Sequence, residues 1–426
     1  MTLRDLGERL FKPTSLQTHE FTGRSHRVDR STWLWSPPVQ RAVKGAAFVT
    51  PPVCWRAYRD QFPILSDSVY YDVAYKASVP NRVTEAVLGY FSDNQRMAGD
   101  RVALAAAIDD VRAKIAGLIG AGPSQVAFVK NASEGMNLLA HAISYRDGDN
   151  VVISDQEHPT NECPWLNLNR YGVEVRKVES REHRFGVEEL AGLVDARTRV
   201  VSLSAVCQVS GFAPDLRAIS AFCRRRGVLL YIDAIQALGA RALRVDEISI
   251  DGLVTSGHKW LLGPYGTGFL YASSALIDRA TAIFASKHYS RLDLENANTA
   301  YITDAGRWEY GSLNYPGLFG LGAGLDMILE LGIPRIEARI NDLVAELRAS
   351  TERMGLDSVT PASGEGSATG IFSFAIANAA RLAARLREQR IFVSERKGVL
   401  RTSQHFYNDE TDIMRFVDAL KASGSV

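Results

Sequence analysis

Short apolar runs alternate with amphipathic stretches through the middle of the chain. Between residues 126 and 271 these runs are VAFV, VVIS, VEVRKV, RVVSLS, VLLYID, GLVTS and TGFLY. Their length and β-branched content are typical of strands. Segments such as APDLRAISAFCRRRG separate them and have helical periodicity. Strands that alternate with helices predict an α/β fold with a mostly parallel sheet covered on both faces.

The pattern changes on either side of this region. The stretch VALAAAIDDVRAKIAGLIG at 102–120 predicts a helix, and from about residue 317 long helical stretches precede the apolar run IFSFAI, a further helix and short strands. Residues 1–55 contain several prolines and little periodicity. We therefore expect an irregular N-terminal arm (1–55), a large domain (56–316) and a smaller C-terminal α/β domain (317–426).

Charge and cysteine spacing narrow the class of protein. The 426 residues include 49 Lys and Arg against 48 Asp and Glu, a net charge of +1, which gives no field that attracts nucleic acid or an anionic membrane. There is no apolar run of about 18 residues, no CxxC spacing and no secretory signal. We expect a cytoplasmic protein that binds a small molecule and no metal. The cysteines are Cys54, Cys163, Cys207 and Cys223.

The segment TSGHKW places Lys259 between an apolar run and a glycine-rich stretch. Most lysines are solvated surface groups, because burying an ammonium ion without a partner is costly. A partly buried lysine has a lowered pKa and can attack an aldehyde to form a Schiff base. Lys259 is therefore a candidate nucleophile.

Asp233 ends the apolar run VLLYID, and Gln236 follows three residues later. Ligands bind outside the carboxyl ends of parallel strands, which makes Asp233 a candidate site residue. An aspartate at this position also commonly caps the next helix. The functional alternative is an ion pair with a protonated pyridine nitrogen. The residues around Asp233 do not by themselves decide between the two.

Two further segments follow predicted strands. In VAFVKNASEGMNLLA, Ala132 and Ser133 precede a helix expected to begin near Glu134. The free amide groups and positive dipole end of such a helix suit a phosphate, although Ser133 is equally consistent with an ordinary helix cap. In VVISDQEHPTNECPW, His158 stands where an imidazole can lie flat on an aromatic ring. A single histidine is more often structural.

Together these segments resemble the class V aminotransferase family, which includes cysteine desulfurases and isopenicillin-N-epimerase-like enzymes. The resemblance extends from about residue 60 to the end of the chain. Its most specific parts are DAIQALGA at 233–240 and TSGHKW at 255–260, in the order and separation of that family. It implies the α/β aspartate-aminotransferase-like fold, fold type I, with pyridoxal 5'-phosphate (PLP) as cofactor.

The resemblance implies a role for each matching residue. Lys259 would form the Schiff base with PLP, Asp233 would pair with its pyridine nitrogen and His158 would stack on its ring. Gln236 would hydrogen-bond the ring hydroxyl. Gln208 stands where the family commonly has an asparagine that contacts the ring hydroxyl or the substrate. The phosphate would be held by the Ala132 amide, Ser133, Ser256 and His258.

Two later segments complete the implied site. RWEYGSLNYPG at 307–317 resembles the part of the family that reaches the neighbouring subunit's phosphate, so Ser312 would complete the partner's site in a homodimer. VLRTSQHFYNDETDI at 399–413 resembles the stretch whose arginine receives the substrate carboxylate, which assigns that role to Arg401. Without the resemblance, Arg401 would be interpreted as a surface arginine.

The chain also departs from the family's cysteine desulfurases. Those enzymes need a mobile loop cysteine shortly before the carboxylate-binding arginine, and VSERKGVLR at 393–401 contains none. The segment YDVAYK at 71–76 replaces an Asn-Ala type turn. We therefore expect a PLP-dependent C–S lyase that acts on a cysteine-S-conjugate in a biosynthetic pathway, with an unusual substrate, rather than a desulfurase.

Several alternatives stay open on the sequence. Transamination, epimerisation and decarboxylation, the last with or without oxidative deamination, use the same fold, and the sequence does not record which Cα bond stands perpendicular to the ring. A PLP-fold ligand sensor without activity is disfavoured by the intact Lys259 and Asp233. GLFGLGAG at 317–324 follows no strand and predicts helix packing rather than dinucleotide binding.

Overall fold

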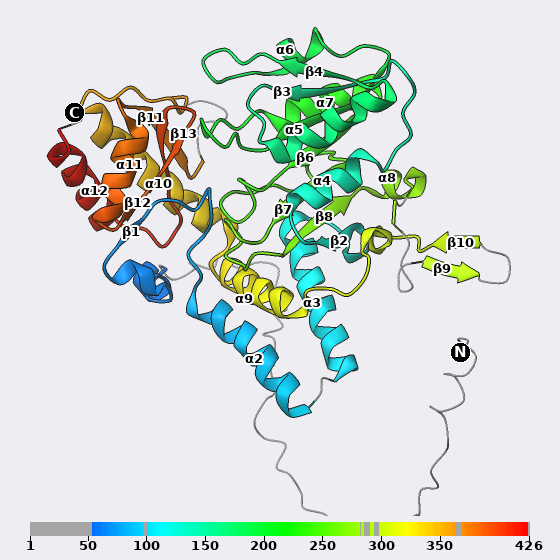
Figure 1. The fold of residues 1–426 in the computed structure, drawn as a ribbon, viewed down its shortest axis with the longest axis horizontal. Coiled ribbons are helices and arrows are strands. Elements are labelled where there is room, and N and C mark those ends of the chain that lie inside the picture. The colour runs from blue at the N-terminus through cyan, green and yellow to red at the C-terminus, as the bar shows by residue number, and fades with distance from the viewer. Residues whose placement is uncertain are drawn as a thin grey trace, which may run out of the picture. The chain divides into compact units, whose positions relative to one another are not determined.

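A seven-stranded sheet lies at the centre of the fold in the computed structural model (Figure 1). The structure describes residues 53–97, 100–281, 283–284, 290–293, 298–362 and 369–424, so nearly all of the predicted arm lies outside the described residues. The strand order is β2-β8-β7-β6-β5-β3-β4, and β8 alone runs antiparallel to its neighbours. The strands are β2 (Val126–Val129), β3 (Asn150–Ser154), β4 (Glu174–Val178), β5 (Thr198–Ser204), β6 (Leu229–Asp233), β7 (Gly252–Ser256) and β8 (Gly268–Ala272).

Both faces of this sheet are covered, which matches the prediction from the continuous apolar runs. Successive side chains of a strand point to opposite faces: Tyr231 of β6 packs in one core cluster, while Leu230 and Ile232 pack in the other. Helices from both clusters pack against the sheet. They include α3 (Arg101–Ile119), α4 (Ala132–Ala140), α5 (Pro159–Leu166), α6 (Val187–Ala191), α7 (Leu216–Arg226) and α8 (Ser274–Arg279).

The C-terminal part is built on a three-stranded antiparallel sheet in the order β11-β14-β13. Its helices gather beside these strands, together with β1 and β12, which pair in parallel although they come from opposite ends of the described chain (Figure 1). The elements are β1 (Val69–Tyr70), α10 (Ile333–Glu352), β11 (Ile371–Ala375), α11 (Ala379–Glu388), β12 (Ile391–Phe392), β13 (Ser394–Arg396), β14 (Val399–Ser403) and α12 (Glu410–Ala422).

Strand β1 ends at Tyr70, because the chain turns at Asp72, whose carbonyl accepts hydrogen bonds from the amides of Tyr75 and Lys76. This turn brings Asp72 beside β14, where it forms an isolated bridge with Ser403.

Close helix packing explains the glycines of GLFGLGAG. They lie in α9 (Tyr315–Leu331), which packs against α2 (Asn81–Met97) and α3. A Cβ on Gly320 would lie 2.9 Å from Cγ2 of Val87 in α2, and a Cβ on Gly322 would lie 2.9 Å from Cγ2 of Val111 in α3, so glycine allows both helices to approach closely. The predicted packing role is confirmed.

No single described helix is long and apolar enough to cross a membrane. The helices α9 and α10 together have the length and apolar composition of a membrane span, but they are bent by 81° relative to each other. The remaining elements are the hairpin β9 (Ser290–Asp293) and β10 (Asn298–Tyr301) and the 3-10 helices Pro63–Ser66, Pro123–Gln125, Asn167–Tyr171 and Ala305–Trp308.

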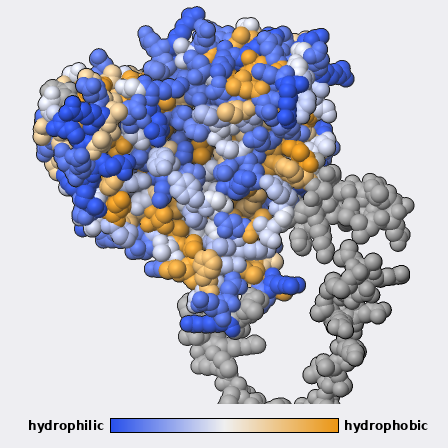
Figure 2. All heavy atoms as spheres, viewed as in Figure 1, coloured by the Kyte–Doolittle hydropathy of each residue, from blue (hydrophilic) through white to orange (hydrophobic). Residues whose placement is uncertain are grey.

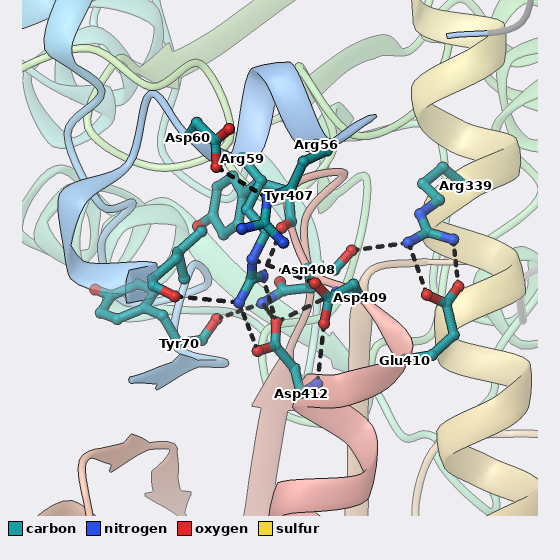
Figure 3. Close-up of polar contacts among 11 residues, drawn as sticks. Arg56, Arg59, Asp60, Tyr70, Arg339, Tyr407, Asn408, Asp409, Glu410 and Asp412 are labelled. Atoms are coloured by element: carbon teal, nitrogen blue, oxygen red, sulfur yellow. Dashed lines mark hydrogen bonds and ion pairs between the residues drawn. The ribbon is translucent and has the colours of Figure 1, made fainter. Parts of the chain in front are cut away.

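A polar network fastens the short helix α1 (Trp55–Arg59) to the start of α12 (Figure 3). The Arg59 guanidinium donates to both carboxylate oxygens of Asp412, at 2.8 and 2.9 Å, and to the carbonyl of Tyr407. Asp412 also closes the capping box of α12 with Asp409. The network therefore joins two chain segments that are more than 300 residues apart.

Candidate active site

The carboxyl ends of the parallel strands gather most of the predicted site residues. Asp233 is the last residue of β6 and Ser256 the last of β7, while His158 follows β3 as the N-cap of α5. Lys259 comes three residues after β7 and is 8% exposed. Because parallel strands end at one edge of a sheet, these residues share one region.

Lys259 and Asp233 interact electrostatically, as the predicted site requires. Burial lowers the pKa of Lys259 to about 8, against the opposing effect of the Asp233 carboxylate. Burial raises the pKa of Asp233, which the positive charge of Lys259 partly counteracts. The Lys259 amine is therefore closer to its nucleophilic form than the amine of a surface lysine.

Asp233 has one carboxylate oxygen that lacks a partner. Its Oδ1 accepts a hydrogen bond from the amide of Ile235 at 3.0 Å, while Oδ2 is buried with no hydrogen-bond partner among the described residues. No helix begins after Asp233 in this part of the chain, so the helix-cap alternative is wrong. A buried oxygen without a donor is costly, and a protonated ring nitrogen supplies the missing donor. The residues present fit a pyridine ring.

His158 lies within reach of the same charges. Its Nδ1 accepts from the amide of Thr160 at 3.1 Å, and burial together with the charge of Lys259 lowers its pKa to about 4. The ring is therefore neutral near pH 7. A neutral imidazole is suited to lie against an aromatic ring, as predicted, although its helix-capping role shows that it also has a structural function.

The predicted phosphate-binding residues lie at the start of α4 and the end of β7. The amide of Ala132 donates to Ser256 Oγ at 2.8 Å, and Ser133 Oγ lies 2.9 Å from Thr160 Oγ1. Ser133 is not the helix cap: α4 begins at Ala132, and Asn131 is its N-cap. The exposed Ser133 hydroxyl thus belongs to the first turn of the helix, where amide groups and dipole favour an anion.

His258 has defined contacts with Tyr265 and Ala77. Its ring stacks on Tyr265 at 4.3 Å between centroids, and burial lowers its pKa to about 4. Its carbonyl accepts from the amide of Ala77. His258 therefore connects the Lys259 segment to the turn that follows β1.

The two predicted glutamines differ in how they are held. Gln236 is buried, with Nε2 donating to the Ala74 carbonyl at 3.0 Å and Oε1 accepting from Trp260 Nε1 at 2.8 Å. One Nε2 hydrogen is left for a ring hydroxyl. Gln208 is half-buried and its carbonyl accepts from Arg401 Nη1 at 2.8 Å, so its backbone, rather than its side chain, has a defined contact.

Arg401 is buried within the site rather than on the surface. Only 1% of it is exposed, and its Nη2 lies 3.6 Å from Asp72 Oδ1. Its Nε and Nη2 have no hydrogen-bond partner among the described residues. The Nε–Nη2 edge therefore offers two coplanar N–H donors, from which a carboxylate can accept two parallel hydrogen bonds.

Ser312 lies away from Lys259. It is exposed, on the wall of a cavity of about 290 Å³ that Lys130, Glu134 and Tyr310 also line. A neighbouring cavity of about 480 Å³ shares these last three residues and includes Ser133. Ser312 and Ser133 therefore lie on two sides of one polar cluster, and within this chain Ser312 does not join the Lys259 group.

Three residues of the site were missed from the sequence. Glu157, fully buried beside His158, accepts from Ser154, Asn161 and Ser204, and its charge raises the pKa of Asp233. Asp72 faces Arg401, and Arg396 lies close enough for its charge to lower the pKa of Lys259. The position of Glu157 directly after a strand was a usable signal. The other two are recognisable only through pairing across the chain.

A mostly parallel sheet with a buried lysine and aspartate at its carboxyl edge defines a PLP-dependent enzyme of fold type I. The aminotransferase class-V family model matches residues 69–416, and the chain belongs to this family. Members of the family use pyridoxal phosphate, so the predicted family, fold and cofactor are confirmed.

Individual relatives cover most of the chain. A protein of Methanothermobacter thermautotrophicus, named "Probable cysteine desulfurase", is 30% identical over 392 residues, which are 85% of this chain and 96% of its own length. The apo structure of cysteine desulfurase from Thermococcus onnurineus NA1 is similar with a TM-score of 0.80 at 22% identity, covering 86% of this chain and 96% of that one. The structure of the cystine C-S lyase C-DES in complex with its product cysteine persulfide is similar with a TM-score of 0.79 at 22% identity. The match covers 84% of this chain and 99% of that one.

The names of these relatives conflict with the prediction that the chain is not a desulfurase. The structural likenesses show the fold, and a sequence identity of 30% does not decide the reaction. All four cysteines are free; Cys54 and Cys163 are exposed, and burial raises the pKa of both Cys207 and Cys223. The thiols of these buried cysteines are therefore poor nucleophiles.

Proposed function

We propose that the chain is a PLP-dependent C–S lyase that cleaves the Cβ–S bond of a cysteine-S-conjugate. The observation that carries this proposal is the composition of the charged interior: Lys259, Asp233 and Arg401 are all buried there, and the hairpin that leads to Arg401 contains Ser394 and Arg396 but no thiol. Such a site can activate an amino acid but has no cysteine in this hairpin to receive its sulfur.

Lys259 and Asp233 would hold the two reactive positions of the cofactor. When bound, PLP supplies an electron-withdrawing ring that stabilises negative charge at the substrate's Cα. Asp233 Oδ2 would accept a hydrogen bond from the protonated ring nitrogen and keep it cationic, and Lys259 would bind the aldehyde carbon. His158 would cover one ring face. The start of α4, with Ser133, and Ser256 would receive the phosphate.

The substrate is oriented by Arg401. Its Nε–Nη2 edge would bind the α-carboxylate, while Nη1 stays anchored on the Gln208 carbonyl. The Lys259 amine, when it is not bound to the cofactor, would take the proton from the substrate's Cα. The lowered pKa of Lys259 leaves a usable neutral fraction near pH 7.

Cleavage then follows from the electron pair left at Cα. The Cβ–S bond breaks, its electron pair leaves with sulfur, and the thiolate takes up one proton. The remaining three-carbon fragment takes up one water and yields pyruvate and ammonia. No oxidant or acceptor thiol is consumed, which agrees with a hairpin before Arg401 that contains no cysteine.

Cysteine desulfuration is the second candidate, and the names of the relatives favour it. It would need a thiol from another part of the chain or from a second molecule, because no cysteine lies in the hairpin before Arg401. The cystine lyase among the similar folds cleaves a C–S bond with cysteine persulfide as its product. This precedent of the same fold supports the lyase proposal.

A homodimer is part of the proposal. Figure 2 shows hydrophobic residues gathered over α2, where Leu88 and Phe91 are 61% and 52% exposed. Exposed apolar patches of this kind mark interaction surfaces. Ser312, exposed beside the Tyr310 cavity, would then face the partner's phosphate.

Product analysis tests the reaction. The purified holoenzyme is incubated with L-cysteine, L-cystine and S-alkyl-cysteines, and pyruvate, ammonia, thiol, alanine and sulfide are quantified. Equal amounts of pyruvate, ammonia and thiol from an S-conjugate support the lyase. Alanine and sulfide from cysteine would instead show a desulfurase, and a keto acid without ammonia would show a transaminase.

A further inference from the structure

Arg396 shares a face of the C-terminal sheet with Arg401. In the antiparallel pair β13–β14, Ser394 lies opposite Arg401 and Arg396 opposite Val399. Side chains two residues apart on a strand, and directly opposite each other across a pair, point to the same face. Arg396, Ser394 and Arg401 therefore point to one side of the sheet.

That side is the interior of the candidate site. Ser394 Oγ donates to Asp72 Oδ1, which is also the oxygen nearest to Arg401. From β11, Ser373 pairs with Arg401 and donates to the carbonyl of Val209, beside Gln208. The positive charge of Arg396 lowers the pKa values of both Lys259 and His158, which agrees with this placement.

Unlike Arg401, Arg396 has no carboxylate within ion-pair distance among the described residues, although its charge opposes the burial that raises the pKa of Asp72. Lys259 is opposed by Asp233, and Arg401 has Asp72 at 3.6 Å. Arg396 makes no ion pair within the described part of the chain, and its Nη1 donates only to the carbonyl of Glu395, at 2.8 Å. Its charge is therefore available to an anionic ligand.

The surroundings of Arg396 are open and aromatic. Its guanidinium lies 6.0 Å from the ring centroid of Tyr75, which is 54% exposed. Tyr265, 52% exposed, stacks on His258, the neighbour of Lys259. Arg401 is thus the buried cation of the site and Arg396, which is half-buried, its cation nearer the solvent.

We propose that Arg396 binds a carboxylate at the far end of the sulfur substituent, so that the substrates are cysteine-S-conjugates with two acidic groups. This inference rests on the proposed lyase function. The spacing supports it: with strands about 4.8 Å apart and about 3.4 Å per residue, the two arginines stand about 8 Å apart on their common face. An S-carboxyalkyl chain of one or two methylenes spans a comparable distance between its carboxylates.

The test compares an acid with its uncharged amide. The substrates are S-(2-carboxyethyl)-L-cysteine and the primary amide of its side-chain carboxylate, and the readout is kcat/KM for pyruvate release by holoenzyme. The wild type should prefer the acid by about tenfold or more, as expected for a charge-assisted contact. Arg396→Gln should remove this preference by lowering kcat/KM for the acid, and Arg396→Lys should restore part of it.

Lys397→Gln is the matched control. Lys397 is the exposed neighbour on the same hairpin, so its loss removes one charge without changing the site face. It should keep the preference for the acid. An equal loss for acid and amide in Arg396→Gln, or loss of the preference in Lys397→Gln, would overturn the inference.

Binding separates this inference from the reaction. If neither compound releases pyruvate, the lyase proposal fails, but both can still be titrated against the cofactor's visible absorption band. A lower Kd for the acid that Arg396→Gln abolishes would support the Arg396 subsite without lyase activity. Equal Kd values for acid and amide in the wild type would refute it.

Discussion

Burial of charge sets the chemistry at the residue scale. Lys259, Asp233, Asp72 and Arg401 are each at most 8% exposed, although isolated ions at such positions are costly. They oppose one another as two pairs, and each pair keeps polar atoms free for a ligand: Oδ2 of Asp233 and the Nε–Nη2 edge of Arg401. The protein therefore has a polar interior that a cofactor and a substrate complete.

Lys259→Ala should abolish turnover and leave the fold intact. The substituted protein would still bind PLP through Asp233 and the start of α4, but borohydride would no longer attach it covalently. Absorption spectra and mass spectrometry after reduction measure this. Lys421→Ala, a surface change on α12, should behave as the wild type. Residual activity near the wild-type level in Lys259→Ala would remove its assigned role.

The rate at which the apo-protein captures PLP should increase with pH, reach half of its maximum near pH 8 and level off about one pH unit higher. Only the neutral amine attacks the aldehyde, and burial lowers the pKa of Lys259 to about 8 from the usual 10.5. Stopped-flow absorbance between pH 6 and 9.5 records the profile. A rate that is still rising steeply at pH 9.5 would mean that the amine titrates like a surface lysine.

Sequence reasoning found the residues that lie beside recognisable strands. Lys259, Asp233 and His158 each follow an apolar run, so their place at the sheet edge was predictable. The place of Asp72 and Arg396 in the site was not predictable in this way, because it depends on how distant strands pair. Arg396 shares a face with Arg401 only through the register of β13 and β14. The predicted roles of these site residues remain predictions.

The bounds of the central strands can be predicted from the local pattern of apolar residues, whereas the positions of helix caps and turns depend on contacts with neighbouring residues. The strands lie within one or two residues of the apolar runs, because all of them except the edge strand β4 are buried on both faces. The α4 start was misplaced by two residues because Asn131, rather than Ser133, provides the side-chain oxygen that caps it. Such errors change which hydroxyl is free for a ligand.

Arg59→Ala should lower the free energy of unfolding by about 3 kcal/mol, because it leaves the buried carboxylate of Asp412 without its cation. The side chains of Arg59 and Asp412 are 12% and 1% exposed. Arg56→Ala is the control: it breaks an ion pair in which both side chains are more than 60% exposed, and should cost less than about 0.5 kcal/mol. Urea denaturation measures both. Similar losses for the two variants would show that the network in Figure 3 adds no particular stability.

At the scale of the whole molecule, the holoenzyme should have twice the mass of one chain in light scattering. Phe91→Asp, on the exposed apolar surface of α2, should shift it toward the monomer by burying a charge in the contact. Met414→Asp, also exposed but on α12, should leave the mass unchanged. A wild-type protein that is monomeric at micromolar concentration would contradict the shared-site proposal.

The family fold was predictable because two motifs fix the large sheet and its edge. The division into domains at residue 317, the cytoplasmic location and the biosynthetic pathway stay predictions, since they depend on how parts of the chain and of the cell are arranged. The reaction also stays a proposal. It depends on which Cα bond of the substrate stands perpendicular to the cofactor ring, and that orientation is a property of the complex of protein, cofactor and substrate.

The contact between Asp72 and Ser394 joins residues that are 322 positions apart. During translation the ribosome delivers Lys259 and the strands around it long before the hairpin that carries Ser394, Arg396 and Arg401. The nascent protein can thus complete its cofactor-holding half first, and gains the groups that select a substrate only when synthesis is almost finished. Premature termination before that hairpin would leave a cofactor lysine without its substrate-binding arginines.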